Sequence, residues 1–176
     1  RSDSSAASDV YKRQVAAQAT TLGKRFADVA EETMIGFDRV EELLARYPLR
    51  GLKGPVGTRL DQLDLLGDPD RVDELEQAVA EHLGFSRVLD SVGQVYPRSL
   101  DLDVVSAIAQ AVSAPSSATT TLRLMAGHEL ATEGFRPGQV GSSAMPHKMN
   151  ARSAERVNGL KLVIDGHLTM AAGLAG

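Results

Sequence analysis

The stretch that decides the class of fold runs from Thr21 to Tyr47 and reads TLGKRFADVAEETMIGFDRVEELLARY. Its large apolar residues recur at steps of three to five, mostly three or four, and this spacing gathers them on one face of an amphipathic helix. Thr20 or Thr21 can cap the start of this helix, and Pro48 ends it. We therefore predict one long helix, whose apolar positions are Leu22, Phe26, Val29, Met34, Phe37, Val40, Leu44 and Tyr47.

Helical patterns also dominate the rest of the chain. Asp68 and Pro69 are typical of an N-cap followed by proline at the first helical position, and Gly84 is typical of a helix end. We expect residues 51–58 and 133–150 to be glycine-rich loops, and residues 85–100 a short strand or an extended link. Further helices are expected over residues 59–66, 69–83, 101–114, 116–130 and 151–174, with Pro115 interrupting the pattern. The sequence thus predicts an all-α fold, a bundle of long helices.

Composition and charge narrow the possible functions. The chain has 176 residues, 43% of them hydrophobic and 24% charged, which is typical of a globular protein. Four Phe and three Tyr are few for a β-sandwich or barrel, and the absence of Cys excludes a disulfide framework, a thiol nucleophile and a Cys-ligated metal. A net charge of −4 argues against general nucleic-acid binding but not against a local cationic pocket.

The first residues look different from the rest. Residues 1–14, RSDSSAASDVYKRQ, are polar and aperiodic, and the chain has no initiating Met. We interpret them as a foreign or disordered N-terminal segment, the alternative being a natural disordered tail. They contain no hydrophobic signal region, and no apolar run in the chain approaches the roughly 20 residues that a membrane span needs, so we expect a cytoplasmic protein.

The stretch with the most chemical groups is GSSAMPHKMN, residues 141–150, in which two hydroxyls, a lysine and an asparagine fall within nine residues. Gly138 and Gly141 can serve as hinges for a loop that closes over a substrate. The backbone N–H groups and the N-terminus of the following helix would favour an anion. Lys148 adds a positive charge, and Asn150 can both donate and accept hydrogen bonds.

Ser142 has three possible roles on spacing alone. It could be a proton-abstracting base, because a positive field would stabilise its alkoxide. It could be a nucleophile, although the usual G-x-S-x-G elbow is absent. It could also form an ordinary serine turn with no chemical role.

GSSAMPHKMN closely resembles the signature loop of the fumarase/aspartase superfamily, roughly G-S-S-x-M-P-x-K-x-N. Three further stretches resemble the adenylosuccinate lyase family of that superfamily, the actinobacterial type especially: QATTLGKR at 18–25, SVGQVYPRS at 91–99 and SAER at 153–156. The resemblance covers about residues 15–176. It implies that these residues form a partial central helical lyase domain, with the signature loop in residues 133–150.

The resemblance implies a C–N lyase of purine nucleotide biosynthesis, which releases fumarate from adenylosuccinate and SAICAR by β-elimination. A base removes a Cβ proton from the succinyl group, an aci-carboxylate carbanion forms, and the C–N bond breaks as an acid protonates the leaving nitrogen. Such an enzyme needs no metal and no cofactor. Its implied partners are a succinyl-purine nucleotide and further copies of the chain in a homotetramer whose active sites each draw on three subunits. No nucleic acid and no membrane is expected as a partner.

The resemblance also assigns catalytic residues by position. Ser142 matches the catalytic base, and Lys148 is placed to stabilise the doubly charged intermediate electrostatically. Glu155 matches a carboxylate that supports catalysis.

Four further positions match residues that hold the substrate: Gln94, Ser143, Asn150 and Arg156. An arginine suits anionic groups because it can bind them with two parallel hydrogen bonds. Without the resemblance, Glu155 and Arg156 would be read as an exposed charge pair on a helix.

One departure from the family concerns the general acid. The family carries a histidine in a T-H-x-Q-type segment upstream, but Tyr11 and Lys12 stand where Thr-His is expected. We do not expect the chain's four histidines to replace it, nor to form a metal site. A smaller departure is Ala151, where many members of the superfamily carry proline.

Three alternatives therefore remain. The chain can be the central part of an adenylosuccinate lyase, inactive by itself. It can belong to another lyase or cycloisomerase of the superfamily. As it stands, it can also be a non-catalytic helical oligomerisation fragment, because the first and last predicted helices are long for a domain of this size.

Overall fold

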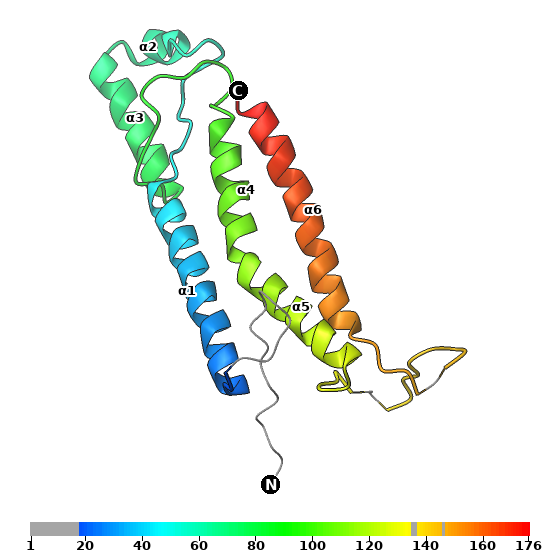
Figure 1. Ribbon diagram of the computed structural model, residues 1–176. Helices are drawn as coiled ribbons and strands as arrows, with labels where there is room; N and C mark the ends of the chain where they lie inside the picture. Colours follow the sequence, from blue (N-terminus) through cyan, green and yellow to red (C-terminus); the bar gives the residue numbers. More distant parts are fainter. Residues whose placement is uncertain (1–17, 135–136, 146) are drawn as a thin grey trace. The chain divides into compact units, whose positions relative to one another are not determined.

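A computed structural model describes residues 18–134, 137–145 and 147–176 (Figure 1). The interpretation of residues 1–14, including Tyr11 and Lys12, falls outside these residues. In the described part the helices are α1 Leu22–Arg46, α2 Leu60–Leu66, α3 Pro69–His82, α4 Ser99–Ala111, α5 Ser113–Gly127 and α6 Arg152–Leu174. No strand occurs there beyond an isolated parallel bridge between Leu49 and Val88. The predicted all-α class is confirmed.

The chain divides into two compact units. Of the described residues, 18–37 and those within 108–166 make up the first, and 38–107 and 167–176 make up the second. The first unit therefore contains α5 and residues 141–150, whereas the second contains α2, α3 and the glycine-rich residues 51–58. Among the described residues, no helix is both long enough and apolar enough to span a bilayer.

Two predicted helices are confirmed almost to the residue. α1 covers the predicted stretch from Thr21 to Tyr47 with one residue fewer at each end. At the start of α3, a side-chain oxygen of Asp68 accepts a hydrogen bond from the backbone N–H of Asp70 at 3.0 Å, as an N-cap should. Gly84 follows the end of α3 with φ of +81°, the left-handed conformation that glycine adopts readily.

The predicted interruption at Pro115 is wrong in its position. The helices break at Val112, and Pro115 lies in the first turn of α5. Proline is tolerated there because the N–H it lacks would have no partner inside the helix. α5 also ends at Gly127, earlier than the predicted Leu130. Residues 85–98 contain the extended link, which is tied at one point to Leu49.

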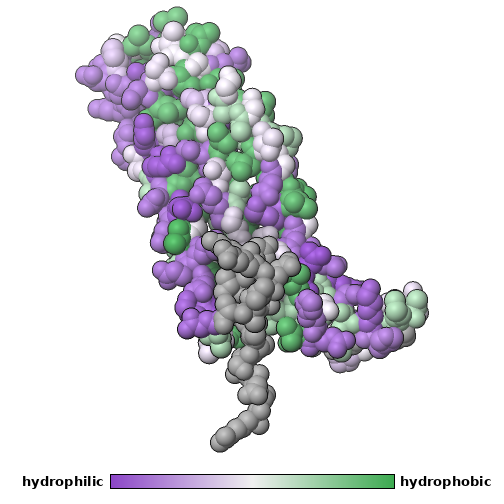
Figure 2. Space-filling model, in the orientation of Figure 1, coloured by the Kyte–Doolittle hydropathy of each residue, from purple (hydrophilic) through white to green (hydrophobic). Residues whose placement is uncertain are grey.

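Small residues let the helices of the first unit approach one another closely. A Cβ atom added at Gly36 of α1 would lie 2.8 Å from the Cα atom of Ala111 in α4. Ala114 and Ala154 are almost fully buried. Many large apolar side chains remain exposed instead, including Phe26 on α1. Figure 2 shows such hydrophobic residues at the surface among hydrophilic ones.

Candidate functional site

Within the predicted signature loop, residues 133–150, the GSSAMPHKMN stretch that begins at Gly141 and ends at Asn150 is joined end to end through Gly141. The buried Gly141 carbonyl accepts hydrogen bonds from the Arg152 guanidinium at 2.6 Å and from the Asn150 amide at 3.3 Å. Asn150, predicted to hold the substrate, thus donates to the first residue of its own loop. Both donors lie at the junction with α6, so they join the two ends of the loop.

Ser142 is half-buried and forms a serine turn. Its hydroxyl oxygen accepts hydrogen bonds from the backbone N–H groups of Ala144 and Met145, at 3.3 and 3.4 Å. This geometry is the one expected if Ser142 forms an ordinary serine turn, the third of the roles considered for it. Hydrogen bonds donated to an oxygen also favour its charged form, so the same contacts suit a serine that must lose its proton. The side chains of Ser143 and Lys148 are exposed, and the backbone N–H of Lys148 donates to Met145 O at 3.0 Å.

Glu133 anchors the region at the start of α6. Its carboxylate accepts hydrogen bonds from the backbone N–H groups of Ser153 and Ala154, at 3.1 and 3.0 Å. The hydrogen bond from Ala154 lowers the pKa of Glu133 from its ordinary value of 4.5, against a smaller effect of burial, and Ser153 lowers it further. The N-terminus expected to favour a substrate anion is thus occupied by a carboxylate of the chain itself. Spacing could not reveal this, because Glu133 is far from α6 in sequence.

Glu155 and Arg156 project from the first turns of α6 and are exposed. A carboxylate oxygen of Glu155 lies 3.9 Å from a guanidinium nitrogen of Arg123 on α5. Arg123 is a residue that sequence reasoning missed. It is the one charged residue of α5, and a lone charge in a helix of small and apolar residues is a signal that could have found it.

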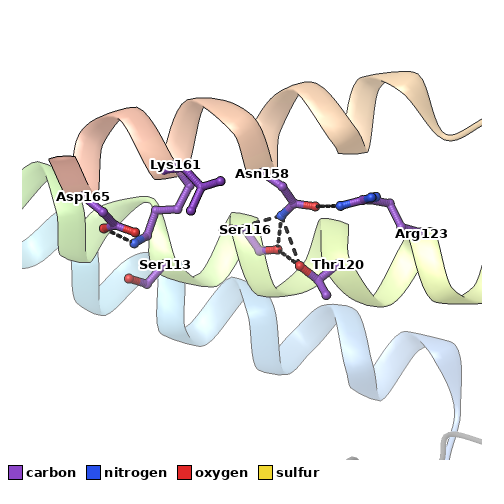
Figure 3. A pocket seen from close by; sticks show the side chains of 8 residues that line it. Ser113, Ser116, Thr120, Arg123, Asn158, Lys161 and Asp165 are labelled. Atoms are coloured by element: carbon purple, nitrogen blue, oxygen red, sulfur yellow. Dashed lines mark hydrogen bonds and ion pairs between the residues drawn. The ribbon is translucent and has the colours of Figure 1, made fainter.

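Asn158, one turn after Glu155, is the centre of a polar network between α5 and α6 (Figure 3). Its amide nitrogen lies within hydrogen-bond distance of the Ser116 carbonyl (2.9 Å) and of the hydroxyls of Ser116, Thr119 and Thr120 (3.1, 3.0 and 3.1 Å). Its oxygen accepts from Arg123 at 3.2 Å. This network fixes how α6 lies against α5, and so where the first turns of α6 stand.

A groove of about 380 Å³ lies beside this network, with Lys161 and Asp165 paired along it (Figure 3). Hydroxyl, amide and charged groups from both helices line it. The lining residues are Ser113, Ser116, Thr120, Arg123, Asn158, Lys161, Leu162 and Asp165. None of the residues predicted from the signature loop is among them.

Gln94 belongs to the second compact unit, unlike the other predicted site residues. It is exposed and follows Gly93, whose carbonyl accepts a hydrogen bond from the Arg50 guanidinium at 2.6 Å. Within the first unit, Ser142 and Lys148 lie in the loop before α6, and Glu155 lies in the first turn of α6. Among the described residues, no three His, Cys, Asp or Glu side chains gather to hold a metal ion.

Comparison with known proteins gives a consistent picture. The profile of a protein family described as lyase matches residues 11–166. The adenylosuccinate lyase of Saccharomyces cerevisiae is 37% identical over 142 residues, which are 80% of this chain and 30% of that protein. Those of Streptococcus mutans and Methanothermobacter thermautotrophicus are 31% and 32% identical, over 89% and 86% of the chain and 34% and 33% of their own lengths. The chain therefore spans about a third of the length of these relatives.

Proposed function

Because this chain belongs to the lyase family of the fumarase/aspartase superfamily, we propose that it is the central part of an adenylosuccinate lyase. In this proposal the whole protein is a cytoplasmic enzyme. It cleaves succinyl-purine nucleotides, adenylosuccinate and SAICAR, into fumarate and the purine nucleotide by β-elimination. The similarity to adenylosuccinate lyases from fungi, bacteria and archaea supports this choice within the superfamily.

The observation that carries the proposal is the environment of Ser142. In the proposed reaction its hydroxyl oxygen, as the alkoxide, removes the Cβ proton of the succinyl group. A free serine hydroxyl is a weak base, so the enzyme must favour its ionised form. Two backbone N–H groups already point at this oxygen, those of Ala144 and Met145, and Lys148 supplies positive charge from the same loop.

The electron pair that proton removal leaves on Cβ spreads into the carboxylate attached to Cβ, and this aci-carboxylate group then carries two negative charges. Lys148 stabilises this charge, since it lies on the loop that carries the base. Arg156, Ser143 and Asn150 hold the anionic groups of the substrate, together with Gln94. Glu155 supports catalysis from the first turn of α6. The C–N bond then breaks, and an acid outside the described residues protonates the nitrogen.

Assembly is part of the proposal. Large apolar side chains of α6 within the first unit are exposed, with Leu162 at 72%. An exposed apolar surface of several neighbouring side chains marks an interaction site. This supports association with further copies; that the assembly is a homotetramer, in which neighbouring copies complete each active site, is proposed from the resemblance to the family.

The test uses the full-length protein. Adenylosuccinate turnover is followed by the appearance of AMP and fumarate, with argininosuccinate as the alternative substrate. Ser142→Ala should reduce kcat by about three orders of magnitude or more while substrate binding, measured by calorimetry, stays nearly unchanged. Near-normal kcat in this variant would exclude Ser142 as the base. Turnover of argininosuccinate but not of adenylosuccinate would assign the protein to another branch of the superfamily.

A further inference from the structure

The glycine-rich loop, residues 51–58, makes several close contacts within the second unit, and the proposed function does not use it. We propose that Arg50, together with Gly57 of this loop, is a positioning residue for Gln94. It holds the backbone just before Gln94 and so sets where the Gln94 amide meets the substrate. This inference rests on the proposed function, because it takes Gln94 as a substrate-binding residue.

Arg50 joins three carbonyl groups with one guanidinium. Its Nη2 donates to Gly54 O at 2.9 Å and to Gly93 O at 2.6 Å, and its Nη1 donates to Gly51 O at 3.4 Å. The first and third acceptors lie in the glycine-rich loop, while Gly93 directly precedes Gln94. Charged donors make strong hydrogen bonds, and arginine holds five N–H donors on three nitrogens in a fixed plane, whereas the three donors of lysine rotate about one nitrogen.

A second contact reaches the same short segment. Gly57 has φ of +83°, and a Cβ atom added there would lie 2.2 Å from the carbonyl oxygen of Val92. The obstacle is backbone, so no side-chain movement could relieve it. Arg50, directly before the loop, thus contacts Gly93, and Gly57, within the loop, lies against Val92.

The loop is in turn fixed to α3 by a buried ion pair. The Lys53 ammonium lies 2.6 Å from one carboxylate oxygen of Glu76, and the other oxygen accepts the Leu52 N–H at 2.8 Å. Lys53 and Glu76 are both more than 90% buried. Gly51 approaches this carboxylate so closely that an added Cβ would lie 2.4 Å from it. The loop therefore connects α3 to residues 92 and 93, the two residues before Gln94, through close contacts at both of its sides.

The segment has few other restraints. Upstream, Leu89 is tied to Leu49, its N–H donating at 2.9 Å, and downstream the Tyr96 hydroxyl donates to Asp101 at 2.9 Å. Between these two points, in residues 90–95, the described part of the chain makes a single hydrogen bond, which Arg50 donates to the carbonyl of Gly93. Removing Arg50 should therefore free Gln94 without unfolding the elements on either side.

The test is a double-mutant cycle in the full-length protein, with Arg50→Lys, Gln94→Ala and the double variant. Arg50→Lys should raise KM for adenylosuccinate about tenfold and change kcat less than about twofold, since Gln94 holds the substrate. In the Gln94→Ala background, Arg50→Lys should raise KM less than about twofold further, because a positioning residue acts only through the residue it positions. Arg46→Lys, in an exposed ion pair of the same unit, is the matched control and should leave KM unchanged.

A KM effect of Arg50→Lys that is undiminished by Gln94→Ala would overturn the proposal, as would an unchanged KM in the folded single variant. Gly57→Ala is the second variant, and it should show the same non-additivity. If both variants failed to fold, the contact would serve the fold itself, and the proposal would again be overturned.

Limited proteolysis within residues 90–95, measured without substrate, separates this inference from the proposed function. Arg50→Lys should speed proteolysis there and leave α3 uncut. Faster proteolysis in a protein that does not turn over adenylosuccinate would contradict the proposed function but support the positioning role of Arg50. Turnover of adenylosuccinate with unchanged proteolysis would contradict the positioning role alone.

Discussion

Replacing Glu133 by Gln tests how the start of α6 is anchored to the first residue of the predicted signature loop. The Glu133 carboxylate accepts one hydrogen bond from Ser153 and one from Ala154, with one oxygen for each. Gln keeps a single carbonyl oxygen, so its NH2 group would face one of the two N–H donors. The variant therefore loses one hydrogen bond and the favourable interaction of the negative charge with the helix N-terminus.

The magnitude follows from the exposure of this contact. Removing a side-chain cap costs about 0.5–2 kcal/mol, and solvent screening at an exposed carboxylate favours the lower half of that range. We expect Glu133→Gln to lower the free energy of opening of the first turn of α6 by about 0.5–1 kcal/mol. Amide exchange at Ser153 and Ala154 should then be about two to five times faster.

The effect should also depend on pH with a definite sign. Hydrogen bonds from the backbone lower the pKa of Glu133 in the folded protein below its ordinary value of 4.5. A lowered pKa means that the contact stabilises the folded state fully above pH 4.5 and is lost as the pH falls through the folded value. The difference between the unsubstituted protein and Glu133→Gln should therefore be constant near neutral pH and shrink in acid.

Hydrogen exchange with mass spectrometry at pH 7, and urea unfolding between pH 7 and pH 3, measure these two effects. Glu129→Gln is the control, because it makes the same charge change at an exposed glutamate nearby and should alter neither. Equal exchange in Glu133→Gln and the unsubstituted protein would refute the anchoring role. If the stability difference between the two proteins grew in acid, the contact would not depend on the ionised form of Glu133, and this part of the reasoning would be refuted.

Three further predictions concern the packing and the chemistry. Gly36→Ala should lower the free energy of unfolding by about 1–3 kcal/mol in urea, because the new Cβ would lie 2.8 Å from a Cα atom of α4. Gly23→Ala on the same helix is the control: the atom nearest to its new Cβ is 3.9 Å away, so this change should be neutral or stabilising. Lys53→Met should cost about 3 kcal/mol in urea unfolding, the lower end of the range for breaking a buried ion pair, because the buried Glu76 carboxylate loses its nearer cation and keeps Arg59 at 3.6 Å. The double variant Lys53→Met/Glu76→Leu should cost less than this single change. The 176-residue chain alone should show no adenylosuccinate turnover by chromatography, because Lys12 stands where the family carries its acid; robust turnover would contradict this.

The helices could be predicted from the sequence because each carries its own local signal. The apolar spacing of α1 and the Asp68 cap of α3 involve residues only a few positions apart. The prediction places the break between these helices at Pro115, whereas it lies at Val112. Pro115 is the more conspicuous residue, but a proline in the first turn of a helix disturbs nothing, so the interruption lies before it.

The candidate site was predicted less completely. The motif predicted the loop that contains Ser142 and Lys148, because the residues stand together in the chain. It could not predict what holds that loop or the segment before Gln94. Glu133 is 21 residues from Ala154, and Arg50 is 43 residues from Gly93. Pairs so far apart leave no periodic trace in a single sequence, and only the fold brings them together.

The serine turn and the catalytic base, two alternatives for Ser142 in the sequence, become compatible in the structure. A turn requires N–H groups directed at the serine oxygen, and a serine base requires the same groups to stabilise its alkoxide. At 3.3 and 3.4 Å these hydrogen bonds are longer than the usual 2.7–3.2 Å for N–H donors. They are therefore weak while the oxygen is a neutral hydroxyl, and a negative oxygen would draw both donors closer. In the proposed reaction the turn thus stabilises the ionised serine more than the neutral one, which is the difference that a base needs.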